Sequence, residues 1–185
     1  MTRNKTTRAG FTLIELSITV AIMGILAASA ITIFTLQQLR AKRTEAMTNL
    51  AAIAKLENGY FGVNGTYPDA LAAPAGVPGE KQNWDALAKA EFAELGFTAE
   101  GSVWYIYDVN TPESGCACPS CFTASAYGDS DRDGATAVVA YFHGAAAPVC
   151  PTMVLGLGPP IDPSDGLPIL NQPIAIPPGP GADDY

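Results

Sequence analysis

A long apolar run near the N-terminus constrains this chain more than any other feature. From Phe11 to Leu36 there are 26 residues, and Glu15 is the only ionisable side chain among them. A helix of about 20 apolar residues spans a bilayer, so this run is long enough to cross a membrane. A carboxylate inside such a run is costly unless it has a partner, so the position of Glu15 needs a physical reason.

The run differs from a cleaved secretory signal. The apolar part of such a signal has roughly 7–15 residues and ends at a small-x-small cleavage site. Ala27–Ala30 resembles such a site, but the run continues through Ile31–Phe34 without a turn-forming residue. We therefore predict a transmembrane helix over residues 11–36. The basic residues of the preceding segment, residues 1–10, keep this end of the chain in the cytoplasm.

Apolar residues recur beyond the membrane segment at steps of three and four, which indicates an amphipathic helix over residues 37–62. Turn-forming residues then gather at Gly59, Gly62 and Asn64-Gly65, where the helix should end. The two segments together predict one helix of roughly 50 residues, whose apolar stripe packs on a globular head. The stripe comprises Leu36, Leu39, Met47, Leu50, Ile53, Ala54 and Tyr60.

The chain after the long helix is predicted to form a head over residues 63–150. Residues 64–80 are rich in Gly, Pro and Ala, which is typical of a loop. A short helix over residues 84–95 follows, with Asn83 at its N-cap and Gly96 at its C-cap.

Three β-branched and aromatic runs complete the head and predict strands. The turn-rich segment Gly128–Gly134 joins the second and third runs into a hairpin of a small antiparallel sheet, one face of which covers the apolar stripe. The tail, residues 151–185, is Pro-rich and is predicted to lie on the sheet in extended form, because Pro cannot donate ladder hydrogen bonds. The fold class is therefore α+β. The three runs are residues 103–107, 122–127 and 135–142.

The charge of the chain limits its partners. Lys and Arg number 10 and Asp and Glu number 18, and three of the basic residues lie in the first ten positions. The rest of the chain is strongly acidic, whereas nucleic-acid binding needs clustered cations, so nucleic acid is not expected as the main partner. We expect no enzyme activity either, because no catalytic constellation can be built around the single histidine, His143.

The stretch "KTTRAGFTLIELSITVAIMGILAA" resembles the N-terminal signal of type IV pilins and of the related pseudopilins of type II secretion. The shared features are a short basic leader, a Gly before an aromatic residue, Thr-Leu-Ile-Glu, and an unbroken apolar helix. In this family the prepilin peptidase cuts after the Gly and methylates the new amino group. The resemblance implies that Gly10 precedes the cut and that Phe11 becomes the methylated N-terminus. It also implies the pilin fold, a long N-terminal helix packed on an antiparallel sheet.

A charge on Phe11 gives Glu15 a physical role. The amine released by the cut lies in an apolar setting, where an unpaired charge is costly, and Glu15 has the opposite sign. The two groups can pair within one chain, or between an incoming subunit and its neighbour in a filament, where the pair fixes the register of assembly. The simpler alternative is a carboxylate at the membrane end that reaches headgroup water.

The resemblance implies a structural subunit of a type IV pilus of the short-leader type, polymerised through its helix for adhesion, twitching motility or DNA uptake. Two alternatives stay open: a pseudopilin of type II secretion, and a membrane-tethered extracytoplasmic binding domain. The implied partners are copies of the chain, other pilins, the prepilin peptidase, the inner-membrane assembly platform and, before assembly, lipid. The implied location is the bacterial inner membrane, with a cytoplasmic N-terminus and a periplasmic C-terminal domain, and then the extracellular pilus.

Four cysteines lie in the head, at positions Cys116, Cys118, Cys121 and Cys150. The C-x-x-C spacing occurs in zinc sites, but a second such pair is missing. Outside the cytoplasm an even set of thiols is better explained by two disulfides. We expect Cys116 or Cys118 to join Cys150 across the sheet, because a Cys118–Cys121 bond closes a very tight ring.

An acidic segment between the last two predicted strands matches the first half of a calcium loop, D-x-D-x-D-G. Ala140 stands where such a loop carries its bidentate Glu, and strands replace the usual flanking helices. Two interpretations remain: a solvated hairpin turn, and a calcium site with Asp129, Asp131 and Asp133 as ligands. No other cofactor is predicted.

A second basic cluster, Arg40, Lys42 and Arg43, follows the membrane segment. Three roles are open for it. Its side chains contact lipid headgroups, pair with acids such as Glu45 on neighbouring subunits, or stay solvated on the helix face.

Overall fold

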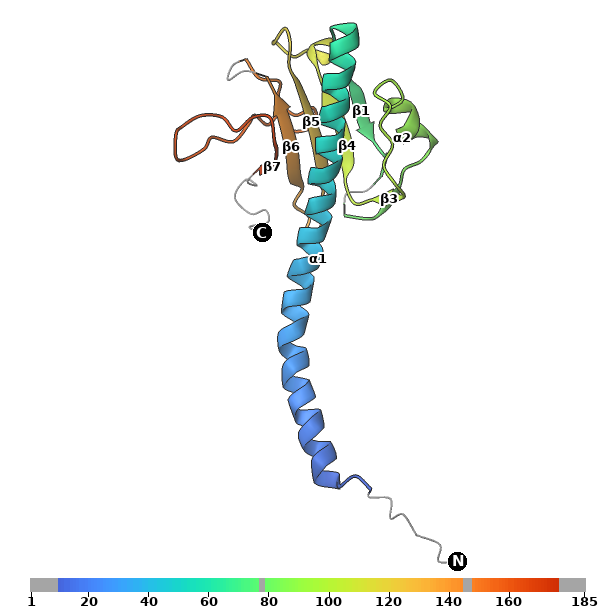
Figure 1. Cartoon of the computed structure of the whole chain (residues 1–185), viewed down its shortest axis with the longest axis vertical. Helices are drawn as coiled ribbons and strands as arrows, with labels where there is room; N and C mark the ends of the chain where they lie inside the picture. Colours follow the sequence, from blue (N-terminus) through green and yellow to red (C-terminus); the bar gives the residue numbers. More distant parts are fainter. Residues whose placement is uncertain (1–9, 77–78, 145–147, 177–185) are drawn as a thin grey trace, which may run out of the picture. The chain divides into compact units, whose positions relative to one another are not determined.

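The computed structural model describes residues 10–76, 79–144 and 148–176 (Figure 1). The predicted leader, except Gly10, lies outside these residues. The chain divides into two compact units, Met1–Gln38 and Leu39–Tyr185. Helix α1 (Leu13–Asn64) has 52 residues and contributes to both units, so the prediction of one long helix is confirmed.

The first unit contains the apolar half of α1. Its large apolar side chains between Leu13 and Phe34 are exposed by 53% to 84%. By length and composition alone the helix is able to cross a membrane, and none of its most apolar window is buried in the described part of the chain. Because large apolar surfaces on soluble proteins mark interaction sites, this half of α1 requires lipid or protein around it.

The second unit is built on a five-stranded antiparallel sheet with the order β1-β4-β5-β6-β7 (Figure 1). The predicted hairpin is confirmed, because β5 and β6 pair without interruption from Phe122↔His143 to Gly128↔Ala137. The strands are β1 (Ala70–Ala73), β4 (Ile106–Asn110), β5 (Phe122–Gly128), β6 (Ala137–His143) and β7 (Pro173–Ile176).

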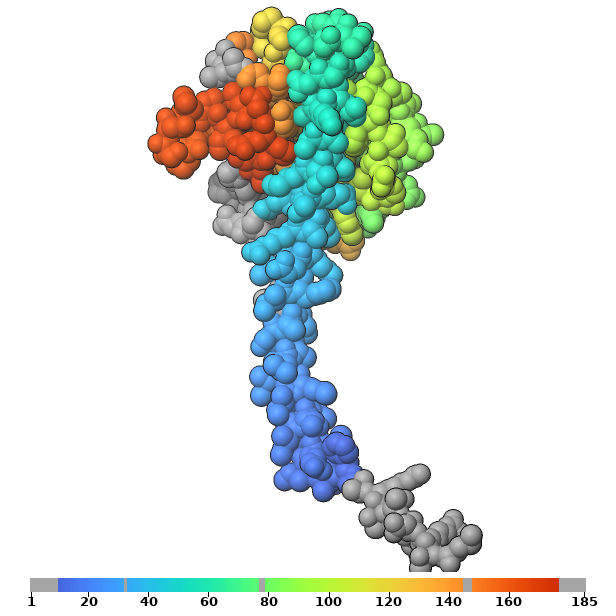
Figure 2. All heavy atoms as spheres, viewed as in Figure 1, coloured from blue at the N-terminus to red at the C-terminus, as the bar shows by residue number. Residues whose placement is uncertain are grey.

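The core lies between the sheet and the second half of α1. Leu50 and Ile53 are fully buried and Ala54 is nearly so, which confirms the central part of the predicted apolar stripe. Burial of a Leu or Ile side chain contributes about 2 kcal/mol, so these residues anchor the helix. Asn49 adds a hydrogen bond from its Nδ2 to the hydroxyl of Tyr107 in β4, at 2.8 Å. Figure 2 shows this half of the helix (cyan) flanked by the α2 segment (green) and the C-terminal segments (red).

One predicted strand, residues 103–107, is divided between two sheets. β3 (Ser102–Val103) pairs with β2 (Gln82–Asn83), whereas β4 begins at Ile106 in the main sheet. The chain bends between them because the backbone N–H of Trp104 donates to Glu45 Oε1 of α1, at 2.9 Å, instead of to a strand.

The predicted short helix is shorter than expected and has a different cap. α2 covers Ala86–Glu91, and Asp85 Oδ1 accepts a hydrogen bond from the N–H of Ala88, at 2.9 Å. Asn83 is therefore not the N-cap; it lies in β2 and accepts a hydrogen bond from the hydroxyl of Ser102. Turns continue from α2 to Gly96, whose φ of 72° is left-handed.

Besides β2, two further strands lie where the sequence analysis places none. β1 occupies part of the predicted loop 64–80, and β7 lies in the Pro-rich tail. β7 is an edge strand whose only proline, Pro173, is its first residue, a position where the missing N–H is tolerated.

Candidate functional site: the start of helix α1 and the polar sites of the head

Thr12 and Glu15 form a reciprocal cap at the start of α1. Glu15 Oε2 accepts hydrogen bonds from the N–H and the hydroxyl of Thr12, at 2.9 and 2.7 Å, and the N–H of Glu15 points to the hydroxyl oxygen of Thr12, at 3.3 Å. This is the capping box, in which a Thr and a Glu three residues later satisfy orphan N–H groups. The sequence analysis missed it, although Thr-x-x-Glu before an apolar run is its signature.

The predicted cleavage point lies directly ahead of this cap. Gly10 and Phe11 precede α1 in non-helical chain, and the Phe11 side chain is 83% exposed. Among the described residues, no atom beyond the neighbours of Gly10 lies within 4 Å of where a Cβ on Gly10 would stand. Glu15 is held within one helical turn of the amine that a cut after Gly10 would release.

The basic residue Lys42 makes a hydrogen bond and a cation–π contact within its own chain. Its Nζ donates to the carbonyl of Ser130 at 2.7 Å and lies 4.0 Å from the centre of the Trp104 ring. Burial is the main cause that lowers the Lys42 pKa. The interpretation of Lys42 as a fully solvated side chain is therefore wrong, whereas its contact with lipid headgroups or with a neighbouring subunit stays a prediction. Glu45 likewise bonds to Trp104 of its own chain.

The four cysteines form one largely buried cluster with two disulfides. Cys116 pairs with Cys150, 34 residues apart, which is one of the two expected pairings. Cys118 pairs with Cys121, so the expectation that this ring is too tight to form is wrong. The described residues contain no free cysteine, so no thiolate is left there for a metal. The hydroxyl of Thr123 in β5 donates to the carbonyl of Cys150 at 2.6 Å, which ties the disulfide segment to the sheet.

Two buried carboxyl groups in the head were not predicted. Glu57 of α1 is 0% exposed, and neither of its carboxylate oxygens has a hydrogen-bond partner in the described structure. Burial raises the pKa of Glu57 to about 8, and the charges of Glu94 and Asp69 add to the shift. Burial also raises the pKa of Asp108 to about 6, although the hydroxyl of Ser125 donates to it at 2.6 Å. Burial therefore disfavours the charged form of both groups, and at neutral pH it keeps Glu57, but not Asp108, mostly protonated.

The single histidine, His143, packs against aromatic rings of the head. His143 stacks on Phe122 with ring centres 4.9 Å apart and meets Tyr67 edge-on. Burial lowers the pKa of His143, which favours the neutral ring.

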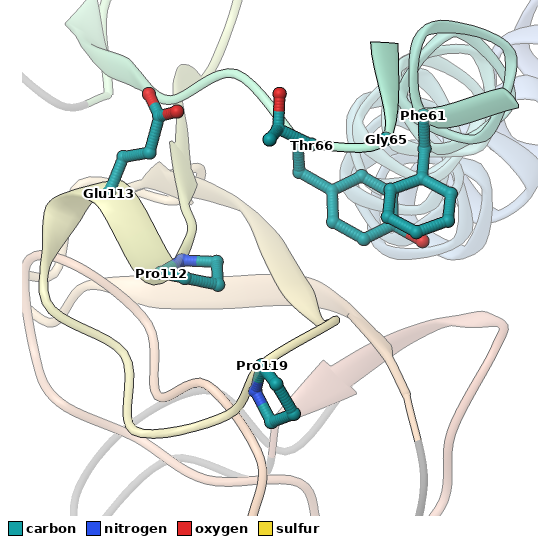
Figure 3. Close-up of a pocket in the computed structure, with 7 residues that line it drawn as sticks. Phe61, Gly65, Thr66, Pro112, Glu113 and Pro119 are labelled. Atoms are coloured by element: carbon teal, nitrogen blue, oxygen red, sulfur yellow. The ribbon is translucent and has the colours of Figure 1, made fainter. Parts of the chain in front are cut away.

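A small cavity of about 70 Å³ opens beside the end of α1 (Figure 3). Phe61 and Tyr67 stack along one side with ring centres 4.4 Å apart, and the other side belongs to the 3₁₀ helix η1 (Pro112–Ser114) and to Pro119. The volume is that of a few water molecules rather than of an organic ligand. The lining residues are Phe61, Gly65, Thr66, Tyr67, Pro112, Glu113 and Pro119.

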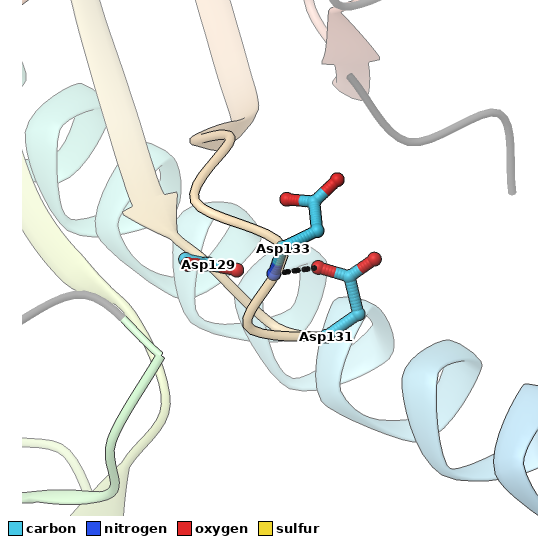
Figure 4. A group of neighbouring side chains, drawn as sticks. All are labelled: Asp129, Asp131 and Asp133. Atoms are coloured by element: carbon cyan, nitrogen blue, oxygen red, sulfur yellow. Dashed lines mark hydrogen bonds between the residues drawn. The ribbon is translucent and has the colours of Figure 1, made fainter. Parts of the chain in front are cut away.

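The acidic segment forms the turn between β5 and β6 (Figure 4). Asp129 accepts hydrogen bonds from the N–H groups of Arg132 and Gly134, at 2.7 and 3.1 Å. Asp131 and Asp133 each accept one from the N–H two residues later. The three carboxylates thus cap the turn. They also offer oxygens within 4.8 Å of one another, and calcium binding there stays a prediction.

Comparison with known proteins agrees with the geometry at the start of α1. Residues 5–31 match the family model described as the prokaryotic N-terminal methylation motif. This segment contains the Gly10–Phe11 bond, the Thr12–Glu15 cap and most of the exposed apolar helix.

The similarity extends into the head. The chain is 37% identical over 141 residues to the type IV major pilin protein PilA of Myxococcus xanthus (strain DK1622). The match covers 74% of this chain and 60% of the relative's length. With the methylation motif, a long N-terminal helix and its packing on an antiparallel sheet, the chain belongs to the type IV pilin family.

Proposed function

We propose that the chain is a structural subunit of a type IV pilus that polymerises through helix α1. The observation that carries this proposal is the exposed apolar half of α1, which directly follows the methylation motif. Type IV pilins are structural proteins, and the chain is accordingly not an enzyme. Residues 1–10 serve as the leader, residues 11–36 as membrane anchor and then filament core, and residues 37–62 as the support of the head.

The proposed route to the filament is the one that membership of the type IV pilin family implies, and the distribution of charge and apolar surface agrees with it. The chain waits in the inner membrane with its N-terminus in the cytoplasm and its head in the periplasm. The prepilin peptidase cuts after Gly10 and methylates Phe11, and the assembly platform adds the subunit to other pilins. In the filament, the apolar faces of neighbouring helices replace lipid around α1, and the pilus becomes extracellular.

Glu15 provides the charge that the mature N-terminus needs. An ammonium group on Phe11 in an apolar filament core costs several kcal/mol unless a counter-charge lies near it. The Thr12–Glu15 cap supports this role, because it holds the carboxylate close to the chain end. The pair forms within one subunit or between neighbouring subunits.

The proposal is tested by mass spectrometry of material that is sheared from cells and pelleted. The expected result is a mature chain that starts at Phe11 with one added methyl group, in the pelleted fraction. A chain that starts at Met1, or after Ala30, and remains in membranes or supernatant would contradict filament assembly and favour a tethered or secreted binding domain.

A further inference from the structure

A short hairpin precedes β7 and has its own backbone hydrogen bonds. In this C-terminal hairpin, residues 160–169, the N–H of Asp162 donates to the carbonyl of Leu167 at 2.8 Å, and the N–H of Ile169 donates to the carbonyl of Pro160 at 2.9 Å. The tip is closed by Asp162 Oδ1, which accepts from the N–H and the hydroxyl of Ser164. The hairpin is therefore a defined protrusion rather than a loose loop.

The C-terminal hairpin exposes apolar side chains beside acidic ones. Ile161 and Leu167 are each 58% exposed. Ile161 forms a β-bridge with Pro168, and Leu167 directly precedes Pro168. The side chains of Ile161 and Leu167 therefore both belong to the bridged base of the hairpin. Asp162 and Asp165 lie in the turn between them. A surface that combines two exposed aliphatic side chains with two carboxylates favours a partner with an apolar hollow and a cation at its rim.

The described head contains such a hollow between α1 and the segment after α2. This α1–α2 groove has a volume of about 500 Å³. Gly59 is part of its lining, and a Cβ placed there would meet no atom of the described residues within 4 Å. The groove is wide and open to solvent, so two aliphatic side chains of a partner can lie along it. The lining residues are Ala52, Lys55, Leu56, Gly59, Tyr60 and Leu95.

The hairpin and the groove lie at opposite edges of the same head. The hairpin leads into β7, the last strand of the sheet, whereas α2 packs on β1, the first strand. In Figure 2 the hairpin segment (red) and the α2 segment (green) lie on opposite sides of α1. They cannot meet within one chain, but the hairpin of one copy can reach the groove of the next. Such a head-to-tail contact uses two different surfaces and so extends into a helical fibre.

We propose that the C-terminal hairpin of one subunit docks into the α1–α2 groove of a neighbouring copy of the same chain. Ile161 and Leu167 enter the groove against Leu56, and Asp162 and Asp165 face Lys55. The occupant is a second copy because its charge and apolar surface complement the groove. This inference rests on the proposed pilus function and names a contact between the globular heads of neighbouring subunits, which the apolar half of α1 does not supply.

Site-directed cross-linking in assembled material tests this contact. The full chain with Leu56→Cys and Leu167→Cys is expressed in cells, and sheared, pelleted material is treated with a short bis-maleimide under non-reducing conditions. The native cysteines are all paired, so only the new thiols react. A ladder of covalent dimers, trimers and larger species is expected from the double variant, and only monomer from each single variant.

A second variant tests the apolar contact without a cross-linker. Leu167→Asp places a charge in the groove and should lower the amount of pelleted subunit about tenfold, the size of effect expected for loss of one interface anchor. Leu71→Asp is the matched control, because Leu71 is also 58% exposed but lies outside the hairpin and the groove; it should have no effect.

The outcomes separate this inference from the proposed function. Pelleted filaments whose subunits start at Phe11, but which give no ladder in the double variant and tolerate Leu167→Asp, overturn the docking contact and leave the pilus function intact. An unaltered chain that never appears in pelleted material overturns both.

Discussion

Glu15 accepts two hydrogen bonds from Thr12, one from its backbone N–H at 2.9 Å and one from its hydroxyl at 2.7 Å. The carboxylate therefore caps the start of α1 within its own chain, without any contribution from a second subunit. Capping requires an acceptor, which a Gln also provides, whereas neutralising an ammonium group requires a charge. The two tasks of Glu15 can be separated by substitution.

We predict that Glu15→Gln leaves the helix start intact but prevents assembly. The amide oxygen can still accept hydrogen bonds from Thr12, but the amine of Phe11 loses its counter-charge. The subunit should reach the membrane, be cut after Gly10, and be absent from sheared, pelleted material. The amounts in membrane and pellet are compared by immunoblotting, with the N-terminus identified by mass.

Thr12→Ala is the complementary variant. It removes the hydroxyl of the cap, at a cost of about 1 kcal/mol to the helix end, and keeps the charge of Glu15. Assembly should persist at a reduced level. Equal pellets from Glu15→Gln and the unaltered chain would show that capping, and not charge, is what assembly needs from Glu15.

The buried carboxyl of Glu57 predicts a stability that falls as pH rises. Its pKa is 4.5 in exposed chain and about 8 in the folded head, so the unfolded state loses its proton first. Between these values the free energy of unfolding should fall by up to about 1.4 kcal/mol per pH unit, and it should level off above pH 8. Denaturant unfolding of the full chain in detergent, followed by tryptophan fluorescence, measures this slope.

Glu57→Gln isolates the contribution of this residue. Asp108 has the same sign of shift, with a pKa raised from 3.8 to about 6, so it contributes only below pH 6. The Gln variant should therefore lose the slope between pH 6 and pH 8 and keep only the part of the slope below pH 6 that comes from Asp108. An unchanged slope above pH 6 would mean that Glu57 is not protonated in the folded head.

The two disulfides should differ in their contribution to stability. The Cys116–Cys150 bond joins residues 34 apart, and loop entropy predicts that replacing both cysteines by Ser costs about 4 kcal/mol. The Cys118–Cys121 bond joins residues only three apart, so the same replacement should cost about 2 kcal/mol. Unfolding of the two double-Ser variants under identical conditions gives the comparison, and a larger loss for Cys118–Cys121 would contradict the ranking.

The acidic turn between β5 and β6 depends most on Asp129. Asp129→Ala leaves the N–H groups of Arg132 and Gly134 without their acceptor and should destabilise the head by about 1–2 kcal/mol, whereas Asp133→Ala loses one such bond and should cost less.

The predicted calcium site in this turn is checked by thermal unfolding of the same head. Added calcium should raise the melting temperature of the unaltered chain and not that of Asp131→Asn; equal melting curves with calcium and with a chelator would remove the site.

Much of the fold was predictable because its signals are periodic and local. The spacing of Leu50, Ile53 and Ala54 is that of one helix face. Two β-branched runs around a Gly- and Asp-rich turn predict the β5–β6 hairpin. β1 and β7 are four residues each and Ala- or Pro-containing, so they owe their strand structure to pairing with β4 and β6 rather than to their own propensity.

The polar sites were harder to predict, because their character depends on tertiary contacts. Glu57 stands one helical step beyond Ile53 and Ala54, on the buried face, but a charged residue at that spacing normally turns toward water. The sequence around Lys42 suggests a solvated cation, because its acceptor, the carbonyl of Ser130, lies 88 residues away in the chain and comes within reach of its Nζ only in the folded head. Asp85 replaces Asn83 as the cap of α2 because Asn83 is taken by β2.

The contacts of Lys42, Glu45 and Asn49 also have a mechanical meaning. These three side chains occupy successive turns of α1 and bond to Ser130, Trp104 and Tyr107 of the head. Because all three cross from the helix to the head, tension directed along the helix axis would load them together, in shear, instead of peeling them apart one by one. A head fastened in this way stays attached while the helix that carries it is pulled.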